Sequence, residues 1–409
     1  MEKETLDFDK TPSANRLHIS FFGRRNAGKS SVVNAVTGQD LSIVSEVKGT
    51  TTDPVKKAME LLPLGPVVII DTPGIDDDGK VGEKRVAKSY QILGMTDVAV
   101  LVIDNFVGPA AEDLELIKLF KKKNIPYIVV LNKVDLDMES LITGADEENK
   151  EQYDFPHILV SALTGQGITE LKEKIAEIGK PLESNKKLIA DKIADCDIVV
   201  LVTPIDASAP KGRMILPQVQ TIRDILDTQA IAMVTQVAEL SACLNALKEP
   251  PALVVTDSQA FQQVKEIVPD SVPLTSFSIL FARFKGILDT AVYGAQYLNK
   301  LKDGDTVLIS EGCTHHRQCE DIGTVKLPGW IKKYSGKKLL FEFTSGGHFP
   351  QDLSAYALVV HCGGCMLGER EMVCRQESAE EQGVPFTNYG ILIAQMNGIL
   401  GRSLEIFYE

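Results

Sequence analysis

The chain has 409 residues, of which 44% are hydrophobic and 24% are charged, and its formal net charge is −13 at pH 7. This composition is that of a globular protein and excludes a fibre or a disordered chain, while the length exceeds one ordinary core. The acidic balance argues against nucleic acid as a partner, because phosphate binding needs clustered basic side chains.

Neither the apolar runs nor the amino-terminal segment predicts a membrane protein. The longest apolar runs are strand-sized and fall short of the roughly 20 residues that span a bilayer. The segment MEKETLDFDK lacks the apolar core of a secretory signal. We therefore expect a cytoplasmic protein with no membrane partner. Its seven cysteines are then no disulfide framework, and four of them lie between Cys313 and Cys365, which suggests a metal site.

Strand-like and helix-like patterns alternate along the chain. The runs LHISFF, VVII, DVAVLVID, IPYIVVLN and HILVSA are separated by amphipathic stretches, which predicts a doubly wound, mostly parallel α/β sheet. A second series, DIVVLVT, AIAMVTQ and ALVVTDS, and a third, TVLIS, KLLFEF and YALVV, predict two smaller α/β domains with buried strands. The expected domains are residues 1–183, 184–272 and 273–409, and we find no internal sequence repeat.

The segment GRRNAGKS, residues 23–30, has the spacing of a P-loop and lies between a predicted strand and a predicted helix. Its glycines let backbone N–H groups approach phosphates, Lys29 reaches the β and γ phosphates, and Ser30 binds Mg²⁺. The motif residues expected at the nucleotide are Gly23, Asn26, Ala27, Gly28, Lys29, Ser30 and Ser31.

Two further motifs complete a GTP site. In DTPG, Asp71 can hold Mg²⁺ through water and the N–H of Gly74 can contact the γ phosphate. The motif NKVD begins with Asn132 and Lys133 and ends at Asp135. The Asp135 carboxylate can accept hydrogen bonds from N1 and the exocyclic amine of guanine, a pattern that adenine does not offer. The chain is therefore predicted to bind GTP and GDP.

The remaining contacts of the nucleotide are predicted from shorter signals. Thr51, in GTTTD, is the candidate that completes the Mg²⁺ shell, with Thr50 as runner-up. Ser161 and Ala162, in SAL, are expected to support the base through their backbone, although Leu163 stands where a lysine is usual.

This set of motifs resembles the GTPases of the Era and TrmE type. Ile75 follows DTPG where Ras-like proteins have the glutamine that positions water, so hydrolysis is expected to be slow. Asn26 matches an asparagine that holds K⁺ in the potassium-activated members of this group. The resemblance thus implies activation by potassium.

The carboxyl-terminal third holds C-T-H at residues 313–315 and H-C-G-G-C at residues 361–365. The second motif places two thiolates, of Cys362 and Cys365, on one tight turn, and Cys313 supplies a third. Together with His315, His316 and His361, these thiolates fit either Zn²⁺ or a [4Fe-4S] cluster with one iron that lacks a cysteine. The residues alone leave both metals open.

A GTPase of this type, followed by a middle domain and these two cysteine motifs, resembles the HydF family of [FeFe]-hydrogenase maturation GTPases over essentially the whole chain. The resemblance implies a [4Fe-4S] cluster on Cys313, Cys362 and Cys365, and His315 and His361 match the family's motif histidines. It also implies that the last domain holds a diiron subcluster precursor transiently and delivers it to apo-[FeFe]-hydrogenase. Two radical S-adenosylmethionine maturases are the further implied partners, and the middle domain is expected to form a homodimer.

The rival interpretation is a ribosome-associated or tRNA-associated GTPase with a structural zinc site, which needs a basic RNA-binding module. A metal-free GTP switch leaves the cysteines unexplained. The fourth cluster ligand, the step that GTP drives and the choice between dimer and tetramer are not decided by the sequence.

Overall fold

The computed structural model describes residues 13–38, 55–73, 92–136, 153–180, 186–204, 214–312 and 322–408. The chain divides into two compact units, Met1–Ser184 (unit 1) and Asn185–Glu409 (unit 2). Within the described ranges, no helix combines the length and the apolar character needed to cross a membrane.

Unit 1 is built on a six-stranded sheet, sheet A, with the strand order β2-β3-β1-β4-β5-β6. All neighbouring strands are parallel except β2, which runs antiparallel to β3. The prediction of a doubly wound, mostly parallel sheet is therefore confirmed. The strands are β1 (Leu17–Gly23), β2 (Val55–Leu61), β3 (Gly65–Asp71), β4 (Val98–Asp104), β5 (Tyr127–Asn132) and β6 (His157–Val160).

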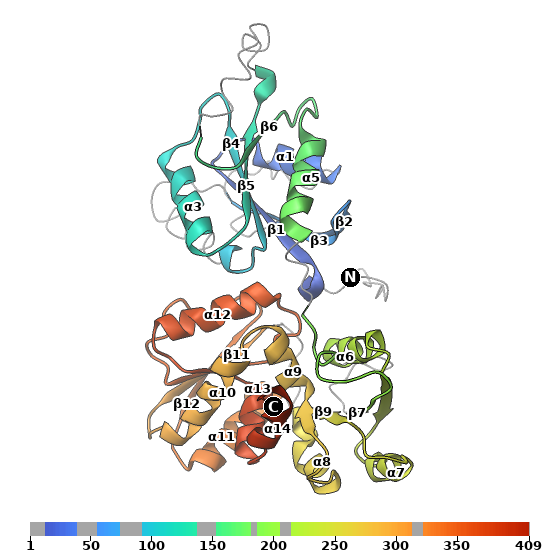
Figure 1. The fold of residues 1–409 in the computed structure, drawn as a ribbon. Coiled ribbons are helices and arrows are strands. Elements are labelled where there is room, and N and C mark those ends of the chain that lie inside the picture. Colours follow the sequence, from blue (N-terminus) through green and yellow to red (C-terminus); the bar gives the residue numbers. More distant parts are fainter. Residues whose placement is uncertain are drawn as a thin grey trace, which may run out of the picture. The chain divides into compact units, whose positions relative to one another are not determined.

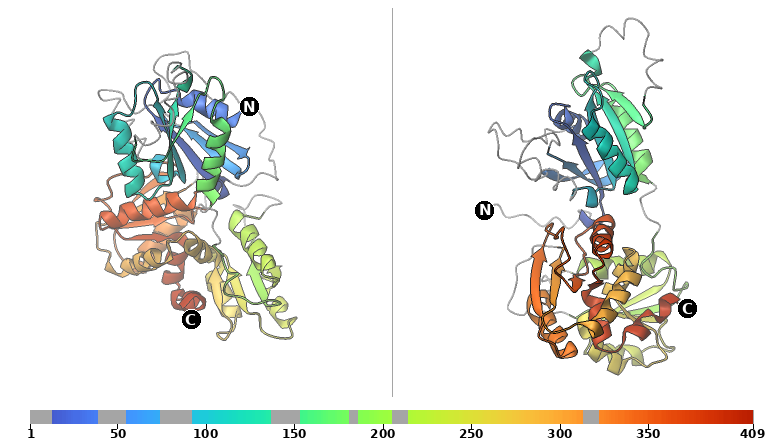
Figure 2. Two further views of the ribbon diagram at one scale, coloured as in Figure 1. Left: turned by 45° about the horizontal axis from the view of Figure 1, so that its top comes forward. Right: turned by 90° about the vertical axis from the view of Figure 1, so that its left-hand side faces the viewer.

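Helices cover both faces of sheet A (Figures 1 and 2). On one face α1 (Lys29–Thr37) and α5 (Ile168–Gly179) pack their apolar stripes against β1, β4 and β5. On the other face α3 (Ala111–Lys122) packs Leu116, Ile117 and Phe120, which recur at helical spacing. The short turns η1 (Ser13–Asn15) and η2 (Val134–Leu136) complete the described part of unit 1.

Unit 2 contains two parallel four-stranded sheets. Sheet B has the order β10-β9-β7-β8 and sheet C the order β12-β11-β13-β14. Because β10 belongs to sheet B, the sheet of the middle region continues past residue 272, where the sequence placed its end. The strands are β7 (Ile198–Val202), β8 (Ile231–Thr235), β9 (Leu253–Thr256), β10 (Leu274–Ser276), β11 (Thr306–Glu311), β12 (Leu340–Ser345), β13 (Leu358–His361) and β14 (Phe386–Asn388).

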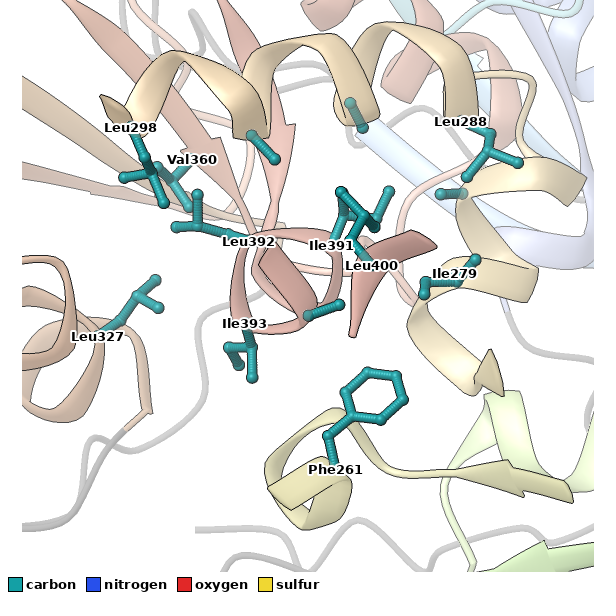
Figure 3. Packing of buried hydrophobic residues seen from close by; sticks show 14 of the residues in the cluster. Phe261, Ile279, Leu288, Leu298, Leu327, Val360, Ile391, Leu392, Ile393 and Leu400 are labelled. Carbon is teal, nitrogen blue, oxygen red and sulfur yellow. The ribbon is translucent and has the colours of Figure 1, made fainter. Parts of the chain in front are cut away.

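One hydrophobic cluster joins the two sheets of unit 2 (Figure 3). Ile391 and Leu392 of α13 lie in it with Phe261 of α8 and Leu298 of η7, and a second cluster covers the other face of sheet B. The helices and short turns are α6 (Leu216–Asp227), α7 (Leu240–Asn245), η6 (Ser258–Ala260), α8 (Phe261–Ile267), α9 (Phe277–Phe284), α10 (Leu288–Gln296), η7 (Tyr297–Lys300), η8 (Ile322–Lys326), α11 (Leu327–Ser335), α12 (Glu369–Glu381), α13 (Tyr389–Met396) and α14 (Leu400–Tyr408).

Sheets B and C are two copies of one arrangement. If the four strands of each sheet are numbered in chain order, both sheets have the same spatial order: the second strand lies at one edge, and the first, third and fourth follow. In sheet C this edge strand is β12, which the sequence predicted to be buried, and Leu340 on it is 61% exposed. The fourth strand and its following helices carry related sequences, VPLTSFSILFARFKGIL at residues 272–288 and VPFTNYGILIAQMNGIL at residues 384–400, which agree at nine of seventeen positions. The expectation of no internal repeat was therefore wrong.

Backbone hydrogen bonds repeat along both copies. The N–H of Ile231 donates to Asp197 O and the N–H of Leu340 to Asp305 O, at 2.8 and 2.9 Å. The two copies also exchange contacts. Thr275 Oγ1 of the first copy donates to the carbonyl of Ser403 in the second, while the equivalent Thr387 Oγ1 donates to a carbonyl of the first. The repeat escapes a scan at constant period because loops of unequal length separate the matched strands.

Candidate functional site

The P-loop of unit 1 joins the end of β1 to the start of α1. Gly28 has a left-handed φ of 83°, and a Cβ there would lie 2.2 Å from Asn132 Nδ2, so only glycine fits. At Gly23, a Cβ would lie 2.4 Å from the carbonyl oxygen of Val102 on β4. The loop is thus packed closely against its neighbours and leads into the amino terminus of α1, where free N–H groups favour an anion.

Three predicted residues of the phosphate and Mg²⁺ site lie together. Lys29 Nζ donates to Asp71 Oδ1, and Ser30 Oγ donates to Asp71 Oδ2 at 3.1 Å. Ser30 begins α1 with Lys29, whereas Asp71 ends β3, the strand beside β1. One divalent cation could therefore contact the Ser30 and Asp71 oxygens directly or through water, and phosphates would compete with Asp71 for the Lys29 ammonium.

Asn132 connects the P-loop to the base-binding segments. Its side chain is 2% exposed. Its Nδ2 donates to Ala27 O at 3.0 Å, and its Oδ1 accepts from the N–H of Ala162 at 3.1 Å. A single side chain at the end of β5 thus holds the P-loop and the SAL segment in register.

The guanine-recognition carboxylate is held by a second pair. The buried hydroxyl of Ser161 donates to Asp135 Oδ1 at 2.5 Å, which orients the other carboxylate oxygen for a base. Lys133 has a left-handed φ of 73° and its ammonium donates to Asp104 Oδ2 at 2.6 Å. Burial acts to raise the pKa of Asp104, but the hydrogen bond and charge of Lys133, together with the backbone N–H bonds of Phe106 and Val107, outweigh burial and lower that pKa.

Of the other residues predicted to bind the nucleotide, the structure describes some and not others. Asn26 is exposed on the P-loop with a φ of 63°, and Ser31 lies at the exposed start of α1. Thr51 and Gly74 lie outside the described residues, as does Thr50.

The cysteine site of unit 2 begins at the carboxyl ends of two parallel neighbours, β11 and β13. Cys362 follows β13 directly, and its Sγ accepts from the N–H of Gly312, after β11, at 3.1 Å. The carboxyl ends of these two strands therefore meet at Gly312 and Cys362. Cys313 and His315 lie outside them, and no group of three or more His, Cys, Asp or Glu side chains suited to a metal occurs within the described ranges.

The turn from Cys362 to Cys365 places backbone N–H groups against the sulfur of Cys362. Gly364 has a φ of 60°, and its N–H donates to Cys362 Sγ at 3.4 Å. Burial raises the pKa of Cys362, while the N–H bonds of Gly312 and Gly364 act to lower it. Two cysteines on a tight turn, with N–H groups aimed at sulfur, fit the soft metal centres, zinc and iron–sulfur, that the sequence left open.

A buried lysine supports this turn from the middle region. Lys285 ends α9 and is 4% exposed, and its ammonium donates to Gly364 O and, at 2.7 Å, to Leu367 O. Burial lowers the pKa of Lys285 to about 8, although the negative charge of Cys365 and Cys362 in their thiolate forms acts to raise it.

His361 is fully buried, and both ring nitrogens have partners. Its Nε2 lies 3.0 Å from Arg375 Nη1 and its Nδ1 lies 2.8 Å from Cys362 O. Because a guanidinium can only donate, Nε2 accepts and Nδ1 carries the proton. Burial and the charge of Arg375 lower the pKa of His361 to about 3, and Arg375 is held in turn by Glu371 at 2.6 Å.

The internal repeat places Asp257 at the position of Cys362. The Asp257 N–H donates to β7 as the Cys362 N–H donates to β11, and the Asp257 carboxylate accepts an N–H two residues on, as the Cys362 thiol does. Ala260 takes the place of Cys365. The two copies therefore share a turn, and among these matched positions only the second copy has cysteines.

Family models match three successive parts of the chain. Residues 18–133 match a 50S ribosome-binding GTPase domain, residues 188–286 a hydrogen maturase F dimerization domain, and residues 289–406 a hydrogen maturase F tetramerization domain. The chain belongs to the hydrogen maturase F family. The resemblance to HydF is thereby confirmed, and a maturase F chain of this kind carries a GTPase domain and two oligomerization domains.

Relatives that match the GTPase domain cover only part of this maturase F chain. GTPase Der of Kosmotoga olearia is 33% identical over 187 residues, 44% of this chain and 42% of its own. The tRNA modification GTPase MnmE of a Roseiflexus species is 37% identical over 181 residues, which cover 42% of this chain and 38% of MnmE. The chain thus spans about two fifths of their lengths. Among solved structures, the G domain of the T. maritima FeoB iron transporter is 25% identical with a TM-score of 0.30. The match covers 40% of this chain and 99% of the FeoB domain.

Sequence reasoning missed several residues that shape both sites. Asp104, Lys285 and Arg375 belong to no motif, and each acts on its site through a contact that only the folded chain forms. The one signal available was a charged residue within an otherwise apolar pattern, as in FSILFARFK before Gly286.

Proposed function

We propose that this chain is a GTP-hydrolysing scaffold that binds a [4Fe-4S] cluster and delivers a diiron subcluster precursor to apo-[FeFe]-hydrogenase. The observation that carries the proposal is the union, in one chain, of a GTPase domain with both maturase F domains and a thiolate turn at the edge of sheet C. Fold alone would not carry it, because P-loop domains serve many functions.

The nucleotide chemistry follows from unit 1. Lys29 would bind the β and γ phosphates, Ser30 and Asp71 would position Mg²⁺, and Asp135 would select guanine. Thr51 stays predicted to complete the Mg²⁺ shell, and the N–H of Gly74 stays predicted to contact the γ phosphate. Release of both on hydrolysis to GDP and phosphate would alter how unit 2 meets its partners.

Potassium activation is part of the proposal. Asn26 occupies an exposed left-handed turn of the P-loop, where its side chain is accessible to a cation beside the phosphates. We expect slow turnover in NaCl, faster turnover in KCl, and loss of that difference in Asn26→Ala. Equal wild-type rates in the two salts would contradict the role of potassium.

The cluster would be held by Cys313, Cys362 and Cys365. When bound, it would supply an iron with an exchangeable ligand, which suits a site that accepts and releases cargo. Gly312 and Gly364 would stabilise the thiolate of Cys362 through their N–H groups. Since both nitrogens of His361 are engaged, we propose that His361 positions the turn, whereas His315 remains a candidate ligand.

Delivery implies partners and an assembly. We propose that two radical S-adenosylmethionine maturases supply the diiron precursor and that apo-hydrogenase receives it, in the cytoplasm and without nucleic acid. We also propose a homodimer through the middle domain at the edge strand β8, where Ile231 and Val234 are each 48% exposed. Edge strands of this kind pair readily with a second copy.

The decisive experiment is anaerobic activation of apo-hydrogenase. The wild-type chain, loaded by the two maturases, should activate it, and a chain with Cys313, Cys362 and Cys365 replaced by alanine should not. Cys243→Ala, a free cysteine of α7 in the middle region, is the matched control and should behave as wild type. Undiminished activation by the triple variant would end the scaffold proposal.

The rival function, a ribosome-associated GTPase with zinc, keeps one supporting observation, the match to a ribosome-binding GTPase domain. Metal analysis separates the two. Brown protein with iron and acid-labile sulfide supports the scaffold, whereas colourless protein with one zinc per chain supports the rival. The net charge of −13 favours the scaffold, because ribosomal RNA repels an acidic chain.

A further inference from the structure

A buried lysine faces the cysteine turn without a carboxylate to neutralise it. Lys285, the C-terminal cap of α9, is 4% exposed, and its ammonium donates to two neutral groups, the carbonyls of Gly364 and Leu367. In the part of the chain that the structure describes, no carboxylate forms an ion pair with it. Because a buried ammonium is costly unless a negative charge lies nearby, Lys285 requires a counter-charge from its surroundings.

The leading source of that counter-charge is sulfur. Burial lowers the pKa of Lys285 to about 8, and the groups that act against burial are, in order, Cys365, Cys362, Glu371 and Glu369, each in its anionic form. Gly364, which accepts from Lys285, lies between the two cysteines. The strongest attraction for the ammonium is therefore a pair of thiolates on the turn that it holds.

Both of the carboxylates already have a cation of their own. Glu371 pairs with the buried Arg375 at 2.6 Å, and Glu369 pairs with Lys186. Their negative charges are thus balanced by other side chains. What is left to balance Lys285 is the charge of the thiolates and of any metal centre that they hold.

The internal repeat offers a comparison within the same chain. Lys285 aligns with Asn397 in the two related sequences at residues 272–288 and 384–400. Asn397 follows α13, which packs against η6 in the turn of the first copy, where Asp257 and Ala260 stand in place of the cysteines. The lysine is therefore found in the helix that serves the cysteine turn, and a neutral amide takes its position in the other helix.

We infer that Lys285 is the counter-ion of the iron–sulfur cluster, whose buried positive charge favours the reduced form and so raises the reduction potential of the cluster. This role rests on the proposed function, because Cys362 and Cys365 must first hold the cluster. Reduction adds one negative charge to a cysteine-ligated cluster, and net charge and burial are among the properties that set its potential. Since Lys285 lies in the dimerization match and both cysteines lie in the tetramerization match, the site depends on both domains.

The test is an anaerobic redox titration of the full-length chain, loaded with iron and sulfide, with dithionite as the reductant and electron paramagnetic resonance as the readout. Lys285→Gln keeps an N–H donor and removes the charge. It should lower the equilibrium constant for reduction by at least about tenfold, a fall of 59 mV in the midpoint potential for one electron. Lys285→Arg keeps the charge and should stay near the wild-type potential.

The matched control is Lys265→Met. It removes another lysine that donates to a backbone carbonyl, that of Asn397 at 3.2 Å, and it should leave the midpoint potential unchanged. Iron and sulfide content is measured for every variant before its titration, so that potentials are compared only between loaded chains.

A second measurement separates charge from packing. A double-mutant cycle combines Lys285→Met with the paired changes Cys362→Ser and Cys365→Ser, and the melting temperature of unit 2 is the readout. As a counter-ion, Lys285 should matter more in the cluster-loaded wild type than in the serine background, where no thiolate of the turn remains. A lysine that only holds the carbonyls of Gly364 and Leu367 would give equal losses in both.

Equal potentials for the wild type and Lys285→Gln, or equal losses of melting temperature in both backgrounds, would overturn the role of Lys285 and leave the scaffold proposal intact. If Lys285→Gln holds no cluster, the melting-temperature cycle decides. A Lys285→Met chain that folds in neither background shows a structural role only, which also overturns the counter-ion. A wild-type chain that takes up no iron and sulfide would overturn the proposed function and the counter-ion together.

Discussion

Replacing Asn132 by aspartate tests how the nucleotide-binding segments are held together. The change conserves shape and keeps an oxygen to accept from the N–H of Ala162, but it replaces the donor to Ala27 O by a second acceptor. Because Asn132 is 2% exposed, neither the carbonyl of Ala27 nor the new carboxylate finds water easily.

The size of the effect follows from these contacts. Losing one hydrogen bond costs about 0.5–1.5 kcal/mol and leaving a buried partner unpaired about 1–3 kcal/mol, so Asn132→Asp should lower the unfolding free energy of unit 1 by about 2–4 kcal/mol. At roughly 2–4 °C per kcal/mol, the melting temperature of unit 1 should fall by about 4–16 °C. GDP affinity should fall at least about tenfold, which corresponds to roughly 1.4 kcal/mol.

The assays are thermal unfolding, with GDP and Mg²⁺ to identify the transition of unit 1, and calorimetric titration with GDP. Gln166→Glu is the matched control, since it makes the same change from amide to acid at an exposed position near the SAL segment. If Asn132→Asp matched Gln166→Glu in both melting temperature and GDP affinity, the bridging role of Asn132 would be refuted.

Three further outcomes are expected. Asp135→Asn should weaken GTP binding by at least about 100-fold, because two charge-assisted hydrogen bonds of about 1.5–3 kcal/mol each are lost. The variant should also prefer a xanthosine nucleotide, and competition binding measures both changes. Lys285→Met should speed hydrogen exchange of the thiolate turn, whereas Lys265→Met, which removes a bond to the end of α13, should leave that turn unchanged. Hydrogen bonds from Arg283 lower the pKa of Asp191 in the folded chain. Their stabilisation is present above the ordinary aspartate pKa and is lost as the pH falls through the pKa of Asp191 in the folded chain. Acid unfolding of the Asp191→Asn variant should therefore depend less on pH than that of the wild type.

Much of the nucleotide site was readable from the sequence. Each of its motifs is a short contiguous segment whose function depends on local backbone, and the parallel sheet brings the ends of β1, β3, β5 and β6 to one edge. The positions of Lys29, Ser30, Asp71 and Asp135 follow from that rule. Thr51, Gly74 and Cys313 remain predictions.

The cysteine site was only partly readable. The motif H-C-G-G-C predicted one tight turn that carries Cys362 and Cys365, and the Gly364 N–H on Cys362 Sγ agrees. Nothing in the motif announced Lys285 or Arg375, because Lys285 reaches the turn from the end of α9, 79 residues before Gly364, and Arg375 reaches back from the following helix α12.

The sequence by itself determined the GTPase motifs, the parallel sheet of unit 1 and the family resemblance, since all three depend on residues close together in the chain. Only the tertiary structure decided the strand order that sheets B and C share, the edge position of β12 and the buried partners of the turn from Cys362 to Cys365. The physical reason is the same for each: strand order, exposure and long-range hydrogen bonds depend on which distant segments pack together, and loops of unequal length hide that pairing in the linear sequence.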